Sequence, residues 1–466
     1  MKMKLATPTY ALLLAIMLTG CANLAPKYVV PTVDTPVAFK EGPGTWVRAA
    51  PADALTRGPW WELFQDPTLN ELASQVQVTN QNVAMAAAQY AQARALTREQ
   101  RATLFPRVDL DADASRSGRG GGGGSSSSYQ VNIGASWEPD VWGRLRLAVQ
   151  SARAGEAASK ADLAAATLAA QGELATNYFG VREADLLRQS QTETVRGFER
   201  SLEIARNRYN VGIAARTDLL QAESQLASAR ADLISLERQR AVFEHAVAVL
   251  LGKAPGNFTL APDPQWRPRI PDIPVEVPST LLERRPDIAA AERRVEQANN
   301  AIGIERAGYF PNLNLSGRIG ASAASIGDLF SASALAWSVG ASLAQTLFDA
   351  GATRARVEGA RAGLDEAAAR YRQTVLTAFQ DVEDQLVALR VLQQQQGLRQ
   401  QAWEAAELVE QQVMNRYRSG LVGFTEVVTA QNSAASARRA LVQVQTDRQL
   451  AAVALIQSLG GGWQGN

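Results

Sequence analysis

The sequence is poor in the residues that most enzymes and metal-binding proteins use. Its 466 residues include one cysteine, Cys21, and one histidine, His245. A single cysteine cannot form an internal disulfide, and a histidine without cysteine or histidine companions is a poor metal ligand. We therefore interpret His245 as a surface or packing residue and expect no metal site.

A charge excess and the common catalytic motifs are also missing. The 47 basic and 46 acidic residues nearly balance, so no strongly basic surface is expected to attract nucleic acid. There is no nucleophile-and-base motif, and the glycine- and serine-rich stretch 117–128 lacks the Gly-Lys-Ser/Thr of a phosphate-binding loop. The sequence therefore predicts no enzyme. We expect 117–128 to be a flexible surface loop, with 320–334 as its counterpart later in the chain.

The apolar segment near the N-terminus, Tyr10 to Leu18, is too short to span a bilayer as a mature helix. Lys2 and Lys4 precede it, and Leu-Thr-Gly at 18–20 follows it as a small-residue cleavage site. Residues 1–20 are therefore predicted to be a secretory signal peptide.

Cys21 directly follows this cleavage site. The Leu-Thr-Gly-Cys sequence resembles the lipobox of bacterial lipoproteins, in which the cysteine becomes the acylated N-terminus; the alternative is a chance cysteine in an ordinary signal peptide. Acyl chains on Cys21 would anchor the chain durably to a membrane, and this covalent lipid is the only added group that we expect. The resemblance also implies, from Ala22 after the cysteine, onward transport to the outer membrane.

The chain contains a tandem duplication. The stretch 416–431 resembles the stretch 208–223, and Gly420 corresponds to Gly212 at an offset of 208 (420 minus 212). Thr425 answers Thr217 at the same offset (425 minus 217), so both copies are expected to hold the same elements without insertions. Any fold must therefore place two equivalent units together.

Each repeated stretch is predicted to be a tight turn between two long helices. Gly212 and Gly420 can adopt positive φ and end the first helix. Thr217 and Thr425 are then expected to cap the second helix, with the acidic residue that follows each threonine in its first turn.

Four segments alternate between apolar and polar residues with the period of a β-strand. They are 107–115 and 129–138 in the first repeat, and 312–319 and 335–343 in the second. Their length suits a transmembrane β-barrel, although soluble half-buried strands are the alternative. Because four strands cannot close a barrel and open edges are not tolerated in lipid, other subunits must complete it.

Three acidic residues, Asp109, Asp111 and Asp113, imitate the start of an EF-hand calcium loop. Ala114 stands where that loop needs glycine, and Gly120 stands where it needs glutamate. On a strand their alternate spacing places all three on one face. We expect that face to line the lumen of the barrel.

Long proline-free segments predict helices far longer than the core of a domain needs. Residues 143–209 and 353–417 are expected to run out to the turns, and heptad spacing predicts coiled-coil packing with their return helices. A shorter helix is expected from Asp66 to Arg101, and Trp46, Trp60 and Trp61 are expected to anchor the extended arm. The predicted organisation is a signal peptide at 1–20, a lipid-anchored extended arm at 21–66, repeat 1 at 67–252, a proline-rich belt linker at 253–283, repeat 2 at 284–462 and a tail at 463–466. The repeats hold strand pairs at 107–138 and 312–343 and hairpin tips near 210–217 and 418–425.

The whole chain resembles an outer-membrane factor of the TolC family, in its NodT-type lipoprotein branch. The residues that carry the resemblance are Leu18 to Cys21, the Trp-Trp-Glu-Leu-Phe-Gln-Asp-Pro of 60–67, the Glu-Arg-Arg-Pro-Asp-Ile of 283–288, 306–311, the Tyr-Arg-Ser-Gly of 417–420 with its echo at 209–212, and 459–463.

The resemblance implies a mainly α protein with a small transmembrane β part. Three chains would contribute four strands each to a 12-stranded barrel, continued by a periplasmic α-barrel. The implied partners are two further copies of the chain, a periplasmic adaptor and an inner-membrane RND-type transporter.

Acidic residues after the second turn close the duct in this family, often at two places three residues apart. The resemblance assigns the periplasmic aperture to Glu426, with Asp218 as its equivalent in the first repeat; the second place falls on Thr429, which is not acidic. The alternative is that both acids only complement their helix dipoles. Candidate adaptor contacts at the tips are Val211, Gly212, Ile213, Leu421, Val422 and Gly423.

The resulting functional prediction is a passive exit duct in the cell outer membrane, which exports small molecules as part of a tripartite efflux pump. Within the family, the outlet of a type I protein secretion system is the alternative. A trimeric adhesin also shares four strands per chain, but its strands form one contiguous C-terminal segment. Here the strands fall into two distant pairs, which disfavours an adhesin.

Overall fold

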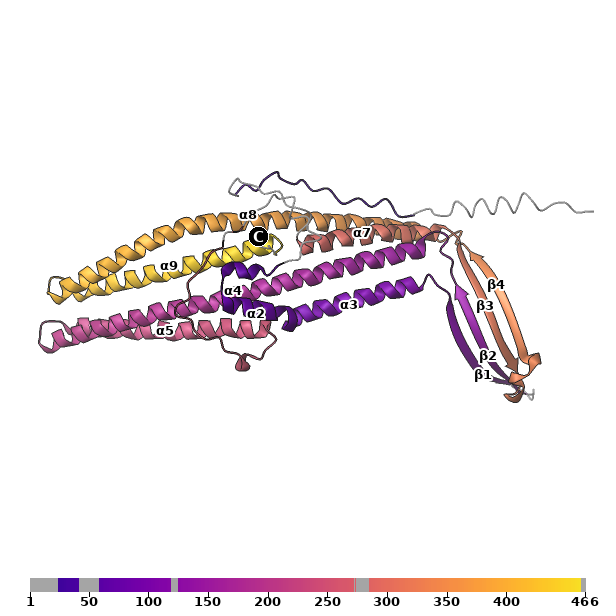
Figure 1. The fold of residues 1–466 in the computed structure, drawn as a ribbon, viewed down its shortest axis with the longest axis horizontal. Helices are drawn as coiled ribbons and strands as arrows, with labels where there is room; N and C mark the ends of the chain where they lie inside the picture. Colours follow the sequence, from indigo (N-terminus) through magenta and orange to yellow (C-terminus); the bar gives the residue numbers. More distant parts are fainter. Residues whose placement is uncertain (1–23, 42–57, 119–124, 272, 274–284, 462–466) are drawn as a thin grey trace, which may run out of the picture. The chain divides into compact units, whose positions relative to one another are not determined.

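The computed structural model describes residues 24–41, 58–118, 125–271, 273 and 285–461. The main helices are α2 (Pro67–Thr79), α3 (Gln81–Ala102), α4 (Arg144–Asn210), α5 (Arg216–Leu250), α7 (Pro286–Arg306), α8 (Ala352–Arg418) and α9 (Phe424–Ser458), and the strands are β1 (Arg107–Gly118), β2 (Ser125–Trp137), β3 (Asn312–Ala323) and β4 (Leu335–Ala344) (Figure 1). The fold is therefore mainly helical with a small sheet, as predicted. No helix in the described part of the chain is both long and apolar enough to span a bilayer.

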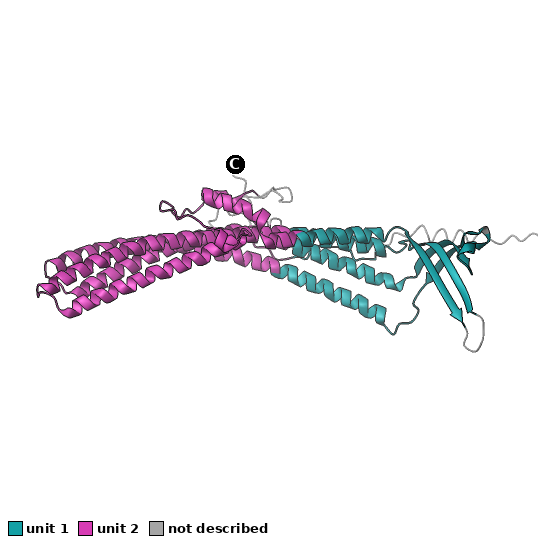
Figure 2. Ribbon diagram, turned by 90° about the horizontal axis from the view of Figure 1, so that it is seen from below, with its two compact units in different colours: residues 1–32, 88–161, 290–373 teal, residues 33–87, 162–289, 374–466 magenta. Residues whose placement is uncertain are grey.

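The chain divides into two compact units (Figure 2). Unit 1 comprises Met1–Thr32, Ala88–Ala161 and Ala290–Gln373, and unit 2 comprises Val33–Ala87, Asp162–Ala289 and Thr374–Asn466. Each unit draws residues from both sequence repeats, so the compact units are not the repeats themselves.

Unit 1 contains the sheet, which has the strand order β1-β2-β3-β4 with every neighbouring pair antiparallel. All four strands lie where the alternation predicts them. The expected loop 117–128 is shorter than predicted, because β1 continues to Gly118 and β2 begins at Ser125, with 119–124 outside the described residues. The expected loop 320–334 is shorter too, since β3 extends to Ala323.

The N-terminal arm lies against helices of unit 1 without forming a helix or strand over 24–32. The Asn299 amide donates to the Pro26 carbonyl at 2.9 Å, and Arg306 donates to the Leu24 carbonyl at 3.1 Å. Both donors belong to α7, and Arg306 is its last residue. The sequence predicts an extended arm at 21–66 with Trp46 among its anchors; residues 24–32 are extended beside α7, and Trp46 lies outside the described residues.

The main core of unit 2 is built around a short 3-10 helix, η2 (Trp60–Phe64). Trp60 and Phe64 are buried together with residues of α2, α4, α5 and α9. Asp66, two residues after Phe64, caps α2 by accepting bonds from the backbone N–H groups of Thr68 and Leu69. The tryptophan-rich stretch thus anchors the helices of this unit.

One predicted helix is wrong in its continuity. The sequence predicts a single helix from Asp66 to Arg101, but the chain breaks at Asn80, between α2 and α3. The Asn80 side chain accepts bonds from the N–H groups of Asn82 and Val83 and donates to the Leu250 carbonyl at 2.9 Å. This buried amide bonds to free N–H groups at the start of α3 and to a free carbonyl at the end of α5. The stabilisation from these bonds outweighs the helix propensity of the surrounding alanines.

The proline-rich linker crosses α4 and α5 within unit 2. Arg182 of α4 donates to the Ala261 carbonyl at 2.9 Å, and Arg240 of α5 donates to the Leu260 carbonyl. Glu244 accepts the Leu260 N–H at 2.6 Å. The sequence does not show this path, because it depends on arginines of other segments.

Candidate functional site

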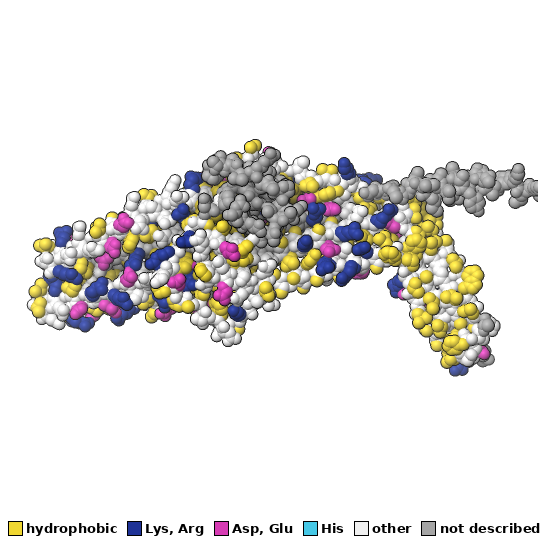
Figure 3. All heavy atoms as spheres, viewed as in Figure 1, with side chains coloured by type: hydrophobic (Ala, Val, Ile, Leu, Met, Phe, Trp, Pro, Cys, Tyr) yellow, Lys and Arg dark blue, Asp and Glu magenta, His cyan; other side chains and the backbone are white. Residues whose placement is uncertain are grey.

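The register of the four strands sorts their side chains into two chemically distinct faces. Leu110 lies opposite Ile133, Ile133 lies opposite Ile319, and Ile319 lies opposite Trp337. Large apolar side chains on this face are exposed in the single chain, including Val108, Leu110, Ile133, Ile319, Leu335, Trp337, Val339 and Leu343. Hydrophobic side chains accordingly gather over the strands in Figure 3. A contiguous exposed apolar face of this kind marks a membrane or partner surface.

The opposite face of the sheet is polar. Asp109, Asp111 and Asp113 lie there on β1, in the alternate positions predicted for them; Asp111 and Asp113 are exposed and Asp109 is half-buried. Asp109 accepts a 2.8 Å bond from Arg107, and in the register it shares a row with Gly134 and Arg318. The sheet therefore has the two-sided pattern of a strand set between lipid and water.

Two strands of the sheet have an open edge. β1 pairs only with β2, and β4 pairs only with β3 within the described chain. Their outer backbone N–H and C=O groups lack the partners that a bilayer interior would require. The sheet is thus an incomplete element that needs further strands.

The hairpin tips repeat the same turn chemistry in both halves of the chain. Gly212 has φ +75° and Gly420 has φ +76°. The Gly212 N–H donates to the Tyr209 carbonyl at 2.9 Å, as the Gly420 N–H donates to the Tyr417 carbonyl at 2.9 Å. A non-glycine residue rarely adopts this φ, so both glycines are required for the helix ends.

The predicted threonine caps are wrong. The residues at the N-caps are Ala215 for α5 and Gly423 for α9, and neither makes a side-chain capping bond. Thr217 and Thr425 instead lie inside the first turns of these helices. Because the tips are exposed, water can serve as acceptor for the first N–H groups in place of a capping side chain.

The predicted aperture residues lie in the first turns of the return helices or just after them. Asp218 is half-buried in α5, whereas Glu426 and Thr429 are exposed in α9. The Thr429 hydroxyl donates to the Thr425 carbonyl of its own helix at 2.9 Å. Asp218 and Glu426 thus occupy equivalent places in the two return helices, and no hydrogen bond joins their side chains in the described single chain.

The predicted adaptor contacts lie at the two turns, and most are exposed. The side chains of Val211, Ile213 and Leu421 are exposed, as are Gly212 and Gly423. Val422 differs, because it is half-buried against a small core at the tips. This tip core consists of Ala205, Ala222, Tyr417, Phe424 and Val427, and it packs the two hairpins of unit 2 together.

A contact between the repeats at this tip core was not predicted. Arg208, in the last turn of α4, donates to the Tyr417 carbonyl at 2.7 Å and lies over the Tyr417 ring at 4.8 Å from its centroid. The cation is thereby a second donor to a carbonyl at the C-terminus of α8, beside the Gly420 N–H, and complements the helix dipole. Burial raises the pKa of Tyr417, with a further increase from the nearby Asp218 carboxylate, against the lowering effect of Arg208. The repetition of Arg-Tyr at 208–209 and 416–417 is the sequence signal that could have indicated this contact.

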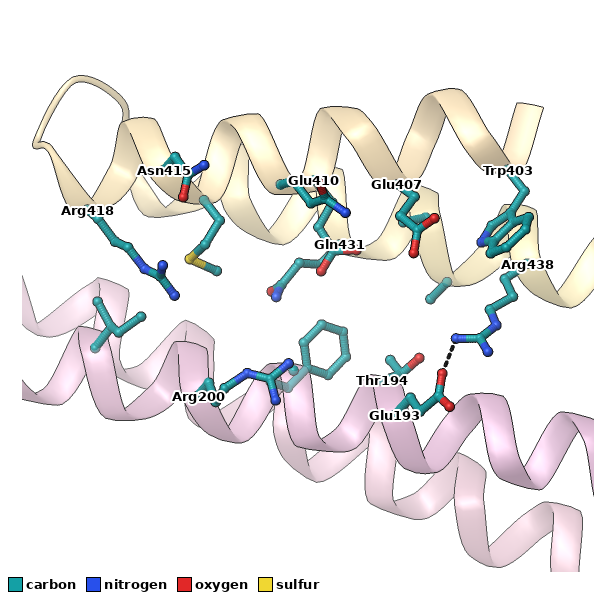
Figure 4. A pocket seen from close by; sticks show the side chains of 17 residues that line it. Glu193, Thr194, Arg200, Trp403, Glu407, Glu410, Asn415, Arg418, Gln431 and Arg438 are labelled. Carbon is teal, nitrogen blue, oxygen red and sulfur yellow. Dashed lines mark hydrogen bonds and ion pairs between the residues drawn. The ribbon is translucent and has the colours of Figure 1, made fainter. Parts of the chain in front are cut away.

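A cleft of about 430 Å³ lies between the hairpins beside the tip core (Figure 4). Its lining includes Glu407 and Glu410 from α8, Arg200 from α4 and Gln431 from α9. Burial raises the pKa of Glu410 and the charge of Glu407 adds to the increase, against the lowering effects of the Gln431 hydrogen bond and the Arg200 charge. Glu193 and Arg438 form an ion pair across one end. The cleft is polar and holds no arrangement of nucleophile and base.

The remaining predicted residues carry no site chemistry in the described chain. His245 is exposed on α5. Among the residues that the structure describes, no group of three or more His, Cys, Asp or Glu side chains is arranged to hold a metal ion. Cys21 lies outside the described residues, so its predicted lipidation stays a prediction.

Comparison with known proteins places the chain among outer-membrane transport proteins. The family model described as outer membrane efflux protein matches residues 72–253 and 277–461. The chain is 32% identical over 470 residues to the outer membrane protein OprJ of Pseudomonas aeruginosa, with 97% of this chain and 95% of that protein covered. It is 29% identical over 457 residues to the probable efflux pump outer membrane protein TtgC of Pseudomonas putida, covering 96% and 94%.

A solved structure shares the fold over almost the same length. The structure of the outer-membrane channel OprN has a TM-score of 0.85 and 30% identity, covering 95% of this chain and all (100%) of that one. These matches confirm the family, the fold class and the outer-membrane location that the sequence predicts. The chain belongs to the outer membrane efflux protein family and is an outer-membrane efflux channel.

Proposed function

We propose that three copies of this chain form the passive exit duct of a tripartite efflux pump. The observation that carries the proposal is the open four-stranded sheet with one apolar and one polar face. In a closed ring, β4 of one copy pairs with β1 of the next, which satisfies both edges and gives twelve strands. The apolar face then contacts lipid, and Asp109, Asp111 and Asp113 line the lumen.

The helical hairpins supply the periplasmic part of the duct. The tips, with their exposed Val211, Ile213 and Leu421, dock with a periplasmic adaptor. The adaptor connects the duct to an inner-membrane transporter of the RND type, which provides energy and selects the cargo. Asp218 and Glu426 narrow the aperture. The protein uses no cofactor. Acyl groups on Cys21 anchor it to the outer membrane, because several acyl groups on one protein give durable membrane binding.

The proposed cargo is small molecules, such as drugs, other toxic compounds or metal ions. The polar face that would line the lumen carries acidic, basic and amide groups, among them Asp109, Arg318 and Asn132, which suits passage of varied compounds. Secretion of a protein through the same duct is the alternative, since a wide passive channel leaves the choice of cargo to its partners.

The test of the proposal is the mass and conductance of the purified lipoprotein. Native mass spectrometry in detergent should give three times the mass of one chain, and the same sample should form discrete conducting channels in planar bilayers. A monomeric protein without conductance would contradict the proposal. Ester-linked lipid on the N-terminal peptide, detected by mass spectrometry, would separately test the anchor; an unmodified Cys21 in the mature protein would rule it out.

A further inference from the structure

The contact between Arg208 and Tyr417 has a second potential copy in the same sequence. Adding the repeat offset to Arg208 gives Arg416 (208 plus 208), and subtracting it from Tyr417 gives Tyr209 (417 minus 208). Both residue types are therefore present twice, at equivalent places next to the two turns. The single chain uses only one of the two possible pairings.

The second pair is unused in the described single chain. Tyr417, which receives Arg208, is 2% exposed, whereas Tyr209 is 38% exposed. The Arg416 side chain is exposed and makes no hydrogen bond or ion pair with the residues that the structure describes. The Tyr209 carbonyl accepts the Gly212 N–H, just as the Tyr417 carbonyl accepts the Gly420 N–H. Tyr209 thus presents the same acceptor and the same ring, without the arginine.

Near Arg416, residues of α8 are exposed where the equivalent residues of α4 are buried. Ser201 and Ser190 of α4 are 2% and 8% exposed, while their equivalents Val409 and Leu398 on α8 are 50% and 66% exposed. Apolar residues therefore stand exposed on the second repeat where the first repeat is covered, by Gln431 of α9 in the case of Ser201. Gln431, which covers Ser201, comes from the second repeat, so the equivalent cover for Val409 must come from a first repeat. One chain has only one first repeat.

We propose that Arg416 of one copy donates to the Tyr209 carbonyl of the next copy and lies over its tyrosine ring. This inference rests on the proposed ring of three chains and names a contact that joins them. Six hairpins then alternate around the tips, with three Arg208 contacts inside chains and three Arg416 contacts between chains. Such a head-to-tail interface forms a closed ring only if each copy carries both the arginine and the tyrosine of the contact. The duplication provides both in every copy.

The chemistry favours arginine at both positions. The last carbonyls of a helix lack partners inside the helix and lie at the negative end of its dipole. A guanidinium can donate to such a carbonyl and stack on an aromatic ring at the same time, which a lysine cannot match. Arg416 would therefore bind the C-terminal end of α4 in the next copy, as Arg208 binds the C-terminal end of α8 in its own chain.

Matched pairs of cysteines test the proposal in the full-length protein. In the first variant, Arg416→Cys and Tyr209→Cys are combined; in the control, Arg208→Cys and Tyr417→Cys are combined. A short bis-maleimide is added to each assembled protein. On a denaturing gel the first variant should give linked dimers and trimers, and the control should stay at the mass of one chain. The parent protein should show neither, because its one cysteine is Cys21.

Native mass spectrometry of the same samples separates two kinds of failure. A trimer in which the 416–209 pair never links chains would overturn this inference and leave the proposed duct intact. The absence of any trimer would overturn both. As an independent measurement, Arg416→Ala should lower the temperature at which the trimer dissociates, with partial recovery in Arg416→Lys. The exposed arginine Arg361 of α8, changed to alanine, is the control; equal dissociation temperatures for Arg416→Ala and this control would also contradict the contact.

Discussion

At the scale of single residues, Asp66 organises the core of unit 2. One of its oxygens caps α2, and the other accepts the Tyr178 hydroxyl at 2.6 Å and the Trp266 indole N–H at 2.9 Å. The sequence shows Asp66 only as the start of a helix. Its partners lie 112 and 200 residues away, so nothing local could reveal them.

Replacing Asp66 should therefore cost more than a helix cap. Asp66→Ala removes the cap and leaves two buried donors without an acceptor, and we expect a loss of about 2–4 kcal/mol in unfolding free energy. Thermal unfolding in detergent, followed by circular dichroism, measures it. The control is Asp263→Ala, whose carboxylate accepts one exposed bond from the Gln265 N–H. If both variants unfold at the same temperature, the proposed role of Asp66 is wrong.

Glu183 on α4 should make unit 2 sensitive to pH. Burial, followed by the charge of Asp447, raises the pKa of Glu183 to about 7 from an ordinary value of 4.5. Between these values the folded state binds more protons than the unfolded state, so the unfolding free energy falls as pH rises from about 4.5 to 7. Above pH 7 this contribution is constant and unfavourable.

The variant Glu183→Gln tests this sign. It should unfold at a higher temperature than the parent at pH 8, with a gain of about 1–3 kcal/mol after allowance for partial solvent screening, and the gain should shrink toward pH 4.5. Glu199→Gln, at an exposed ion pair on the same helix, serves as the control. A gain for Glu183→Gln that does not change with pH would show that its charge is not the cause.

The acidic residues at the tips lead to a prediction about conductance. If Asp218 and Glu426 narrow the aperture, then Asp218→Ala combined with Glu426→Ala should raise the single-channel conductance in planar bilayers. If they only complement the dipoles of α5 and α9, the double variant should lose about 0.3–1 kcal/mol of stability per site with unchanged conductance. The structure places Asp218 near Tyr417, so Asp218→Ala alone is expected to act at the joint between the hairpins.

At the scale of elements, the strands were the easiest part to predict and their joints the hardest. Strict alternation in 107–115 and 312–319 reflects a local rule, because neighbouring side chains of any strand point to opposite faces. The break at Asn80 depends instead on the distant Leu250 carbonyl. The caps at Ala215 and Gly423 show the same limit, since water can replace a capping side chain at an exposed tip.

The two faces of the sheet make different predictions for the same substitution. Val339→Arg places a charge on the apolar face of β4 and should cost about 2–4 kcal/mol near the middle of the bilayer. Ser316→Arg places the same charge on the polar face of β3, where Arg318 already lies. We expect Val339→Arg to abolish recovery of trimers from outer membranes and Ser316→Arg to retain it. Equal recovery of the two variants would show that the faces are assigned wrongly.

At the scale of the whole molecule, the duplication explains why one chain is incomplete. Both repeats have the same turn geometry, but only one repeat finds its cover inside the chain. The sequence predicted the duplication, the four strands and the need for other subunits. It did not predict which faces stay open, because exposure depends on how the hairpins of unit 2 pack through contacts such as Arg208 with Tyr417.

As the proposed exit duct, this protein should carry small molecules out across the outer membrane. The most direct measurement compares the accumulation of a fluorescent toxic compound in a strain that lacks the gene, with the parent gene, Ser316→Arg or Val339→Arg restored. Accumulation should be high without the gene and with Val339→Arg, and low with the parent and with Ser316→Arg. Equal accumulation with and without the gene, across several compound classes, would contradict the proposed duct.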